Sequence, residues 1–256
     1  MAPMGKRLLG TYAILAYLFL HLPLLVLIAF SFNASKYTVW TGWSLDWYRT
    51  VFHDAQLAEA AGNSVLIALC SAGISTVIGT LAAYGMWKRK APVLQSSLYL
   101  SLVTPEIVVG ISLLVFFQWV FHWLHFQLGA ATVIIAHVAF SIAYVVIVVT
   151  ARLETFDPAL EEAAMDLGAT PWRAFWRVTL PALRPGIIAA CLLALIVSFD
   201  DYVITSFVAG VDSETLPMVI YSMARRGVSP AINAISSIIV VLFGVLIMIS
   251  EKMRAS

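Results

Sequence analysis

"RLETFDPALEEAAMDLGATPWRAFWRVTLPALRPG", residues 152–186, is a long charged segment in a chain that is otherwise strongly apolar. The whole chain is 61% hydrophobic and only 11% charged, so a segment this rich in charges and prolines stands out. Asp157 has the character of a helix N-cap, Pro158 of a first-turn proline, and Gly168 of a C-terminal stop. These signals predict a short helix between two apolar regions of the sequence.

A second short helix is predicted directly after the first. Thr170 and Pro171 repeat the start signal, and Pro181 is expected to end this helix. Small and apolar residues share one face of the first helix, which would suit insertion into a groove on another protein. An equally open interpretation is that both helices are amphipathic and rest on the membrane surface. The small-residue face comprises Ala159, Leu160, Ala163, Ala164 and Leu167.

Six apolar segments surround this loop, and each is long enough to cross a bilayer core, which requires about 20 helical residues. They lie near residues 9–31, 61–87, 93–121, 128–151, 186–209 and 229–250. A mean hydropathy of +0.93 agrees with a membrane protein. The chain is therefore predicted to be one all-α polytopic membrane domain over residues 1–256 with six transmembrane helices.

The basic residues predict the orientation of these helices. All but four of the 15 lysines and arginines fall on the same side of the six-segment layout. Because basic residues concentrate on the cytoplasmic side, both termini and the loop 152–185 are predicted to be cytoplasmic. The loops 32–60 and 210–228 are predicted to be external. The four exceptions are Lys36, Arg49, Arg225 and Arg226.

Two carboxylates interrupt the fifth apolar segment, within "LALIVSFDDYVITSFVAG" at residues 193–210. An ionised carboxylate in hydrocarbon costs at least several kcal/mol, so such groups face a cavity or a partner. Asp200 and Asp201 lie about 100° apart on a helix, so both cannot point at one pore.

The neighbours of the two aspartates suggest different roles. Asp201 shares a helical stripe with Ser198 and Thr205 and is predicted to face the substrate pathway. Asp200 shares a stripe with apolar residues and is predicted to pair with a neighbouring helix or a partner subunit. The hydroxyl of Tyr202 can enter either site.

Glu106 is a third acid within an apolar segment. Thr104 and Pro105 precede it in the pattern of a helix start, where a first-turn carboxylate favours the helix dipole. A break at Pro105 would divide the long run 93–121, and membrane proteins accommodate such breaks where they line a cavity. Glu106 is therefore a candidate both for helix capping and for substrate contact.

Several classes of function find no support in the sequence. No Walker-type phosphate loop, catalytic triad or metal-ligand spacing is evident, so no catalytic residue, metal or cofactor is expected in this chain. Cys70 and Cys191 are interpreted as packing residues, and His21 and His137 as hydrogen-bonded core residues. A net charge of +1 gives no indication of nucleic-acid binding.

The charged loop resembles the EAA motif of ATP-binding cassette importer permeases. The matching residues are Glu162, Ala163, Ala164, Gly168, Leu180 and Pro181, while Val178 stands where the family usually has isoleucine. Further segments are similar to the spermidine and putrescine branch of that family. They are "WTGWSLDWY", "GNSV", "TPEIVVGISLL", "SFDDYVITSFVAG", "TLPM" and "RGVSPAINA".

The resemblance implies a type I importer permease fold in a bacterial inner membrane, with the EAA loop inserting into a separate ATPase that carries ATP and magnesium. It also implies a second related permease, two ATPase subunits and an external substrate-binding protein. The substrate would be putrescine or spermidine. Alternatives are a permease for an iron complex or an oxyanion, although an oxyanion would require basic groups in the spans, and a self-sufficient secondary cation carrier, which would not need the EAA loop.

Overall fold

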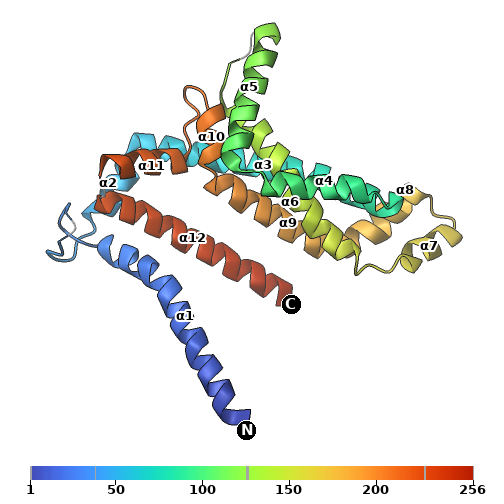
Figure 1. The fold of residues 1–256 in the computed structure, drawn as a ribbon, viewed down its shortest axis with the longest axis horizontal. Coiled ribbons are helices and arrows are strands. Elements are labelled where there is room, and N and C mark those ends of the chain that lie inside the picture. The colour runs from blue at the N-terminus through green and yellow to red at the C-terminus, as the bar shows by residue number, and fades with distance from the viewer. Residues whose placement is uncertain (1, 38, 125–126, 228, 256) are drawn as a thin grey trace. The chain divides into compact units, whose positions relative to one another are not determined.

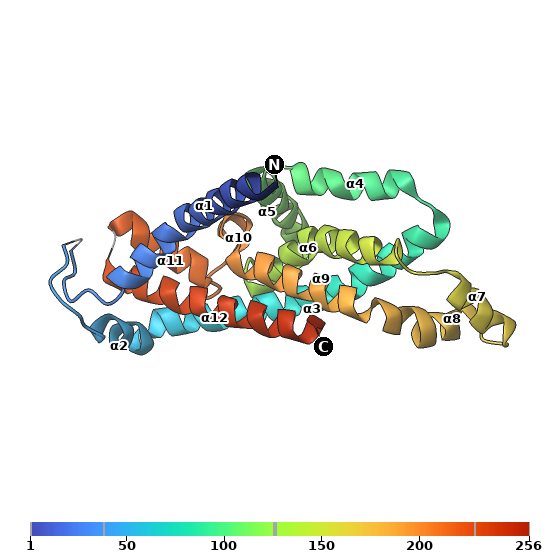
Figure 2. The ribbon, with the colours of Figure 1, turned by 90° about the horizontal axis from the view of Figure 1, so that it is seen from below.

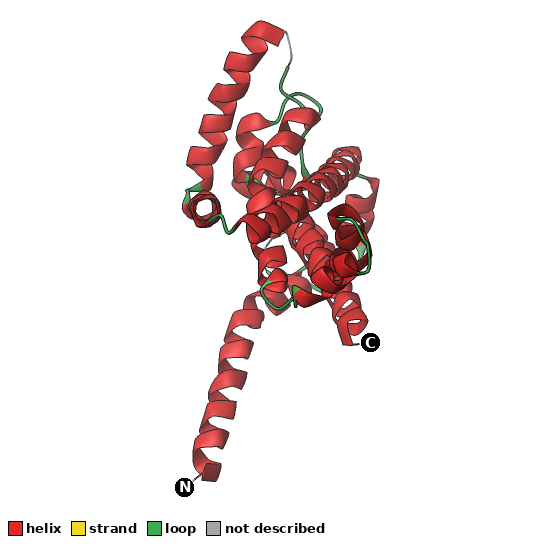
Figure 3. Ribbon diagram, turned by 90° about the vertical axis from the view of Figure 1, so that its right-hand side faces the viewer, coloured by secondary structure: helices red, strands yellow, loops and turns green. Residues whose placement is uncertain are grey.

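A computed structural model describes residues 2–37, 39–124, 127–227 and 229–255. All regular elements in these ranges are helices (Figure 3), which confirms the all-α prediction. The chain divides into two compact units: Met1–Ala58 together with Ile220–Ser256, and Glu59–Val219. Residue 228, at the end of the predicted external loop 210–228, lies outside the described residues.

The first unit is built from α1 (Ala2–Phe30), α2 (Asp46–His53) and α12 (Pro230–Ala255). α12 packs against both α1 and α2. His21 in α1 is exposed and hydrogen-bonds only one turn back, to the Tyr17 carbonyl at 2.8 Å, so its interpretation as a core residue is wrong within this chain.

The loop between α1 and α2 is folded around Asn33, whose side chain is buried. Its amide nitrogen donates to the Val39 carbonyl at 2.9 Å, and its amide oxygen accepts from the Thr41 backbone at 3.0 Å. The Trp47 indole donates to the Asn33 carbonyl at 2.9 Å. The predicted external loop 32–60 therefore has an internal hydrogen-bond network that includes the side chain of Trp47.

The second unit contains α6 (Ala130–Leu153) and α9 (Leu180–Asp200), which lie side by side (Figure 1). α3 (Ala55–Arg89) packs against α6 at Gly79, where an added Cβ would lie 2.6 Å from Val145 Cγ1. Small residues let membrane helices approach this closely. The core between these helices comprises mainly Ala83, Val145, Val146, Val149, Leu183, Ala190 and Ala194.

Two predicted transmembrane segments are broken. α4 (Pro92–Val103) and α5 (Glu106–Leu124) meet at an angle of 101°, which confirms the predicted break at Pro105. The segment predicted as one helix over 186–209 is instead divided, because α9 ends at Asp200 and α10 (Val203–Val208) begins two residues after Asp201. The backbone of Asp201 is extended, with φ −66° and ψ 123°.

The charged loop forms α7 (Ala159–Asp166) and α8 (Pro171–Ala174), as predicted. Gly168 ends the first helix with φ +88°, and Thr170 Oγ1 accepts the Arg173 amide at the start of the second. Figure 2 places both helices beyond the ends of α6 and α9.

Pro181 does not end the second helix, contrary to expectation. A π-helical turn, η1 (Phe175–Thr179), carries the chain directly from α8 into α9. Pro181 then lies in the first turn of α9, where a missing amide hydrogen is tolerated. Local helix widening at the π turn therefore lets the helix continue past a residue that usually stops one.

Helix length and composition give four candidate membrane spans among the described residues, and a fifth when the bent α4–α5 pair counts as one. The apolar part of α12, Pro230–Val245, is shorter. The four are Leu8–Phe30, Ala55–Arg89, Ala130–Leu153 and Pro171–Asp200. The predicted count of six is thus approached but not reached by this criterion alone.

The predicted external loop 210–228 contains α11 (Leu216–Arg226). Gly227 follows it with φ +126°, a left-handed conformation that suits glycine at the end of a helix. The Leu216 backbone amide donates to Ser64 Oγ at 2.8 Å, and Asn63 Nδ2 donates to the Glu214 carbonyl at 3.1 Å. These bonds attach the start of α11 to α3.

Candidate functional site

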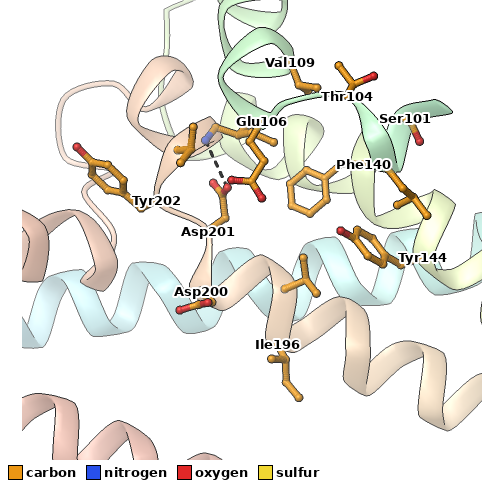
Figure 4. Close-up of a pocket in the computed structure, with 14 residues that line it drawn as sticks. Ser101, Thr104, Glu106, Val109, Phe140, Tyr144, Ile196, Asp200, Asp201 and Tyr202 are labelled. Atoms are coloured by element: carbon orange, nitrogen blue, oxygen red, sulfur yellow. Dashed lines mark hydrogen bonds between the residues drawn. The ribbon is translucent and has the colours of Figure 1, made fainter. Parts of the chain in front are cut away.

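A cavity of about 320 Å³ lies where the break between α4 and α5 meets the break between α9 and α10 (Figure 4). Irregular backbone at membrane depth is tolerated where it lines a cavity, and both breaks do so here. The lining residues are Ser101, Leu102, Thr104, Glu106, Val109, Phe140, Tyr144, Ile196, Val197, Asp200, Asp201, Tyr202, Val203 and Ile204.

Gly110 allows the two broken segments to pack together. α5 and α10 are in extensive contact. A Cβ at Gly110 would lie 2.6 Å from Phe207 Cδ2 and 3.4 Å from the Cα of Ile204. Since a side chain at this position would have to displace Phe207 or separate α5 from α10, Gly110 permits the close packing of the helices that frame the cavity.

Three carboxylates line the cavity, and no lysine or arginine does so among the described residues. Glu106 is the first residue of α5, Asp200 is the last residue of α9, and Asp201 lies in the break. Figure 4 shows the carboxylates of Glu106 and Asp201 directed toward the same part of the cavity, whereas Asp200 points away from them. The lining therefore favours a cation over an anion.

The Asp201 carboxylate is held by the beginning of α10. Its Oδ2 atom accepts from the Thr205 amide at 2.8 Å and from Thr205 Oγ1 at 2.7 Å, while Oδ1 accepts from the Ile204 amide at 3.3 Å. The side chain is only 5% exposed. Carboxylates satisfy free backbone amides at helix starts in this way, so Asp201 orients α10 as well as lining the cavity.

His137 of α6 is completely buried and joins this arrangement from behind the cavity wall. Its Nε2 lies 2.9 Å from Thr205 Oγ1 and 3.3 Å from Asp201 Oδ2. Its Nδ1 lies 2.7 Å from Ser198 Oγ, which is itself 2.7 Å from Ser71 Oγ. The interpretation of His137 as a hydrogen-bonded core residue is confirmed, but its contact with Asp201 was not foreseen.

The six predicted pathway residues thus divide into two groups. Asp200, Asp201, Glu106 and Tyr202 line the cavity, as the residue types suggested. Ser198 and Thr205 are buried and do not line it; they hold His137 and Asp201 instead.

The helix ends at Asp200 instead of running on through Asp201, and both aspartates line the cavity. Their side chains nevertheless point in different directions (Figure 4), which agrees with the prediction that both cannot point at one pore. Asp200 is exposed and makes no hydrogen bond or ion pair with any residue in the described ranges. Asp201, in contrast, has several polar partners.

Aromatic side chains from α6 also line the cavity, and sequence reasoning did not select them. Phe140 and Tyr144 are four residues apart and lie on the same face of the helix. His137 precedes Phe140 by one turn, and their rings are 5.2 Å apart. A polar residue followed by aromatics at helical spacing was the available signal, although the same pattern also occurs in ordinary packed cores.

The motif residues of the charged loop are largely accessible. Glu162, Ala163 and Gly168 are exposed, and Ala164 is partly buried. Leu180 is partly buried and Pro181 is exposed. On the predicted small-residue face, Leu160 is 53% and Leu167 is 90% exposed. An apolar face this open on a helix with no covering element in the described chain is available to another protein or to lipid.

Known proteins resemble this chain over most of its length. Putrescine transport system permease protein PotI of Escherichia coli K12 is 41% identical over 239 residues, covering 91% of this chain and 85% of PotI. Spermidine/putrescine transport system permease protein PotC of the same organism is 36% identical over 251 residues, covering 96% of this chain and 94% of PotC.

Solved structures share the fold. A chain of a bacterial ABC transporter involved in the import of the acidic polysaccharide alginate aligns with a TM-score of 0.74 at 16% identity, covering 98% of both chains. A chain of a bacterial alginate ABC transporter in complex with alginate pentasaccharide-bound periplasmic protein aligns with a TM-score of 0.70 at 20% identity, covering 94% of this chain and 92% of that one.

A family model agrees with the relatives and with the fold. Residues 75–253 match the model described as "Binding-protein-dependent transport system inner membrane component". The matched range includes the broken helices, the acidic cavity and the charged loop. The chain therefore belongs to the family of binding-protein-dependent transport system inner membrane components.

Proposed function

We propose that this chain is a permease subunit of an ATP-driven importer of polyamines, with putrescine or spermidine as substrate. The observation that carries the proposal is the cavity between two broken helices, lined by three carboxylates and no lysine or arginine among the described residues. The names of PotI and PotC, which resemble this chain over nearly its whole length, support the same substrate class.

The chemistry of the cavity fits an organic polycation. A polyamine carries ammonium groups separated by methylenes, so its pathway needs acidic groups with apolar and aromatic surface between them. Glu106, Asp200 and Asp201 supply the acids, and Phe140 and Tyr144 supply aromatic surface. The volume of about 320 Å³ lies at the lower end of the range for small-molecule sites, which suits a slender aliphatic amine.

The proposed arrangement in the membrane has six transmembrane helices in a bacterial inner membrane. In it α4 and α5 form one broken span, α9 and α10 form another, and α12 is the last. Both termini and the loop 152–185 lie in the cytoplasm, because most of the basic residues fall on that side. The loops 32–60 and 210–228 face outward.

ATP-driven transport then requires partner subunits, since the sequence of this chain contains no recognisable nucleotide-binding loop. We assign ATP and magnesium to two cytoplasmic ATPase subunits, with a second permease and an external binding protein completing the complex. The exposed Ala163 and Leu167 of the charged loop support docking of α7 on an ATPase, as small and apolar groups would fill a groove.

Reconstitution in liposomes tests the proposal. The complex purified through a tag on this chain should contain the named partners by mass spectrometry. It should accumulate labelled putrescine or spermidine only with hydrolysable ATP and binding protein. Accumulation of an oxyanion or an iron complex in place of polyamine would overturn the substrate class. Ion-gradient-driven uptake by this chain alone would instead establish a secondary carrier.

A further inference from the structure

Glu161 is buried, in contrast to most of its neighbours in the charged loop. It is only 1% exposed, whereas the adjacent Leu160 is 53% exposed and Glu162 is also exposed. A buried carboxylate is costly unless charged or hydrogen-bonded partners compensate it. The partners of Glu161 therefore indicate why an acid occupies this position.

Three side chains meet the Glu161 carboxylate. Tyr84 donates its hydroxyl to Oε1 at 2.5 Å, and Lys88 Nζ lies 3.2 Å from the same oxygen. Thr179 Oγ1 donates to Oε2 at 3.2 Å. Tyr84 and Lys88 are one turn apart on α3, and Thr179 ends the π-helical turn η1. One carboxylate thus joins α7, the end of α3 and the turn that leads into α9.

Aromatic packing reinforces this junction on the side of η1. The Tyr84 and Phe175 rings lie 4.6 Å apart, and Phe175 is only 2% exposed. Lys88 lies over the Trp87 ring at 5.2 Å, which restrains its ammonium group beside the carboxylate. The end of α3 and η1 are therefore packed together, while α7 is attached to α3 through a polar contact.

The two sides of α7 have different surroundings. One side presents Leu160, Ala163 and Leu167, which are exposed. The other directs Glu161 to α3. A partner that binds the exposed side of α7 can displace the helix. The ionic contact of Glu161 on the other side would then transmit that displacement to the rest of the chain. Such a displacement reaches α3 through Tyr84 and Lys88, and η1 through Thr179.

We propose that Glu161 is a positioning residue that couples α7 to transmembrane helix α3 through Tyr84 and Lys88. When the ATPase moves α7, the Glu161 contact carries this motion into the membrane. The inference rests on the proposed function in one respect, the docking of an ATPase on α7. The contact itself is a property of the folded chain.

The principal variant is Glu161→Gln, which keeps the shape and hydrogen-bonding oxygen but removes the charge. Glu154→Gln makes the same change at an exposed acid in the same loop and serves as the matched control. Reconstituted complexes are compared for ATP hydrolysis and polyamine transport. We expect Glu161→Gln to lower transport per ATP at least fivefold, within the usual range of coupling between sites, and Glu154→Gln to leave it unchanged.

Lys88→Met tests the pair from the other side. Alone it leaves the buried carboxylate without its cation and should lower transport per ATP more than Glu161→Gln does. Combined with Glu161→Gln it should recover part of that loss, because removing both partners leaves no unpaired buried charge. If Glu161 only stabilises the loop, the loss and its partial recovery should appear in the amount of assembled complex, with transport per ATP unchanged.

Hydrogen exchange of residues 159–166 in the purified complex is the readout that does not depend on transport. Glu161→Gln should exchange faster there, and Glu154→Gln should match the wild type. The inference is overturned if Glu161→Gln shows wild-type exchange, or if its transport falls only in proportion to the amount of assembled complex. Wild-type complexes that move no polyamine would instead refute the proposed function and leave the exchange result interpretable.

Discussion

The two adjacent aspartates should respond differently to the same substitution. Asp201 Oδ2 holds Thr205 through its amide and hydroxyl, and Oδ1 accepts the Ile204 amide at 3.3 Å. In Asp201→Asn the amide oxygen can keep the Oδ2 contacts, so the new NH₂ group faces the Ile204 amide. Two donors then oppose each other, and an unsatisfied buried donor costs about 1–3 kcal/mol.

Asp200→Asn is the matched substitution, and it should leave no buried hydrogen-bond donor unsatisfied. Asp200 is exposed at the cavity and has no hydrogen-bond or ion-pair partner among the described residues. At an effective dielectric of about 20, a contact pair of charges is worth about 4 kcal/mol before desolvation is subtracted. A net loss of even about 1.4 kcal/mol in the rate-limiting state would slow transport tenfold.

We therefore expect both variants to slow uptake about tenfold or more, and only Asp201→Asn to lower thermal stability. The assay is labelled putrescine uptake in proteoliposomes, measured beside the melting temperature and yield of the assembled complex. Binding of polyamine to the external binding protein serves as the control and should not change. Wild-type stability of Asp201→Asn would refute the role of its carboxylate in holding α10. Wild-type uptake by both variants would remove the physical basis for a cation pathway here.

The remaining predictions concern the loop, the orientation and the helix spacing. Ala163→Glu should place a charge on the exposed face of α7 and abolish ATP-dependent transport with normal membrane insertion; normal uptake at normal expression would contradict docking there. With the two native cysteines replaced by serine, Val211→Cys should react with an impermeant maleimide added to intact cells and Asp157→Cys should not, and the reverse pattern would invert the topology. Gly110→Ala should collide with Phe207, which lies 2.6 Å from the added methyl, and lower the melting temperature and transport together; an unchanged melting temperature would show that Phe207 moves aside at little cost.

Local patterns in the sequence were sufficient to predict most of the helices and several of the positions where they begin and end. The apolar segments, the caps at Asp157 and Thr170 and the break at Pro105 all depend on residues within a few positions of one another. In the structure Asp157 Oδ1 accepts the Ala159 amide at 3.0 Å, and Thr170 accepts that of Arg173. Helix starts, helix stops and apolar runs of membrane length are local properties, so they can be predicted from a single amino-acid sequence.

Local signals were insufficient where two local rules competed. Pro181 carries a stop signal, yet the π-helical turn before it lets α8 continue into α9. Conversely, no glycine or proline marks the break at Asp201, and the run looked continuous. That break is held by the bonds from Thr205 to the Asp201 carboxylate and by His137, which lies 64 positions earlier in the chain.

The sequence alone thus determined that this chain is a helical membrane protein with an EAA-type loop and acids within its apolar segments. Only the tertiary structure decided that Glu106, Asp200 and Asp201 line one cavity, that Ser198 and Thr205 lie behind its wall, and that Glu161 is the buried acid of the loop. The reason is physical. Whether a side chain is buried, and which groups it bonds to, depends on contacts between helices that are distant in sequence. The residues next to a carboxylate do not show whether it forms a buried hydrogen bond or remains an exposed charge.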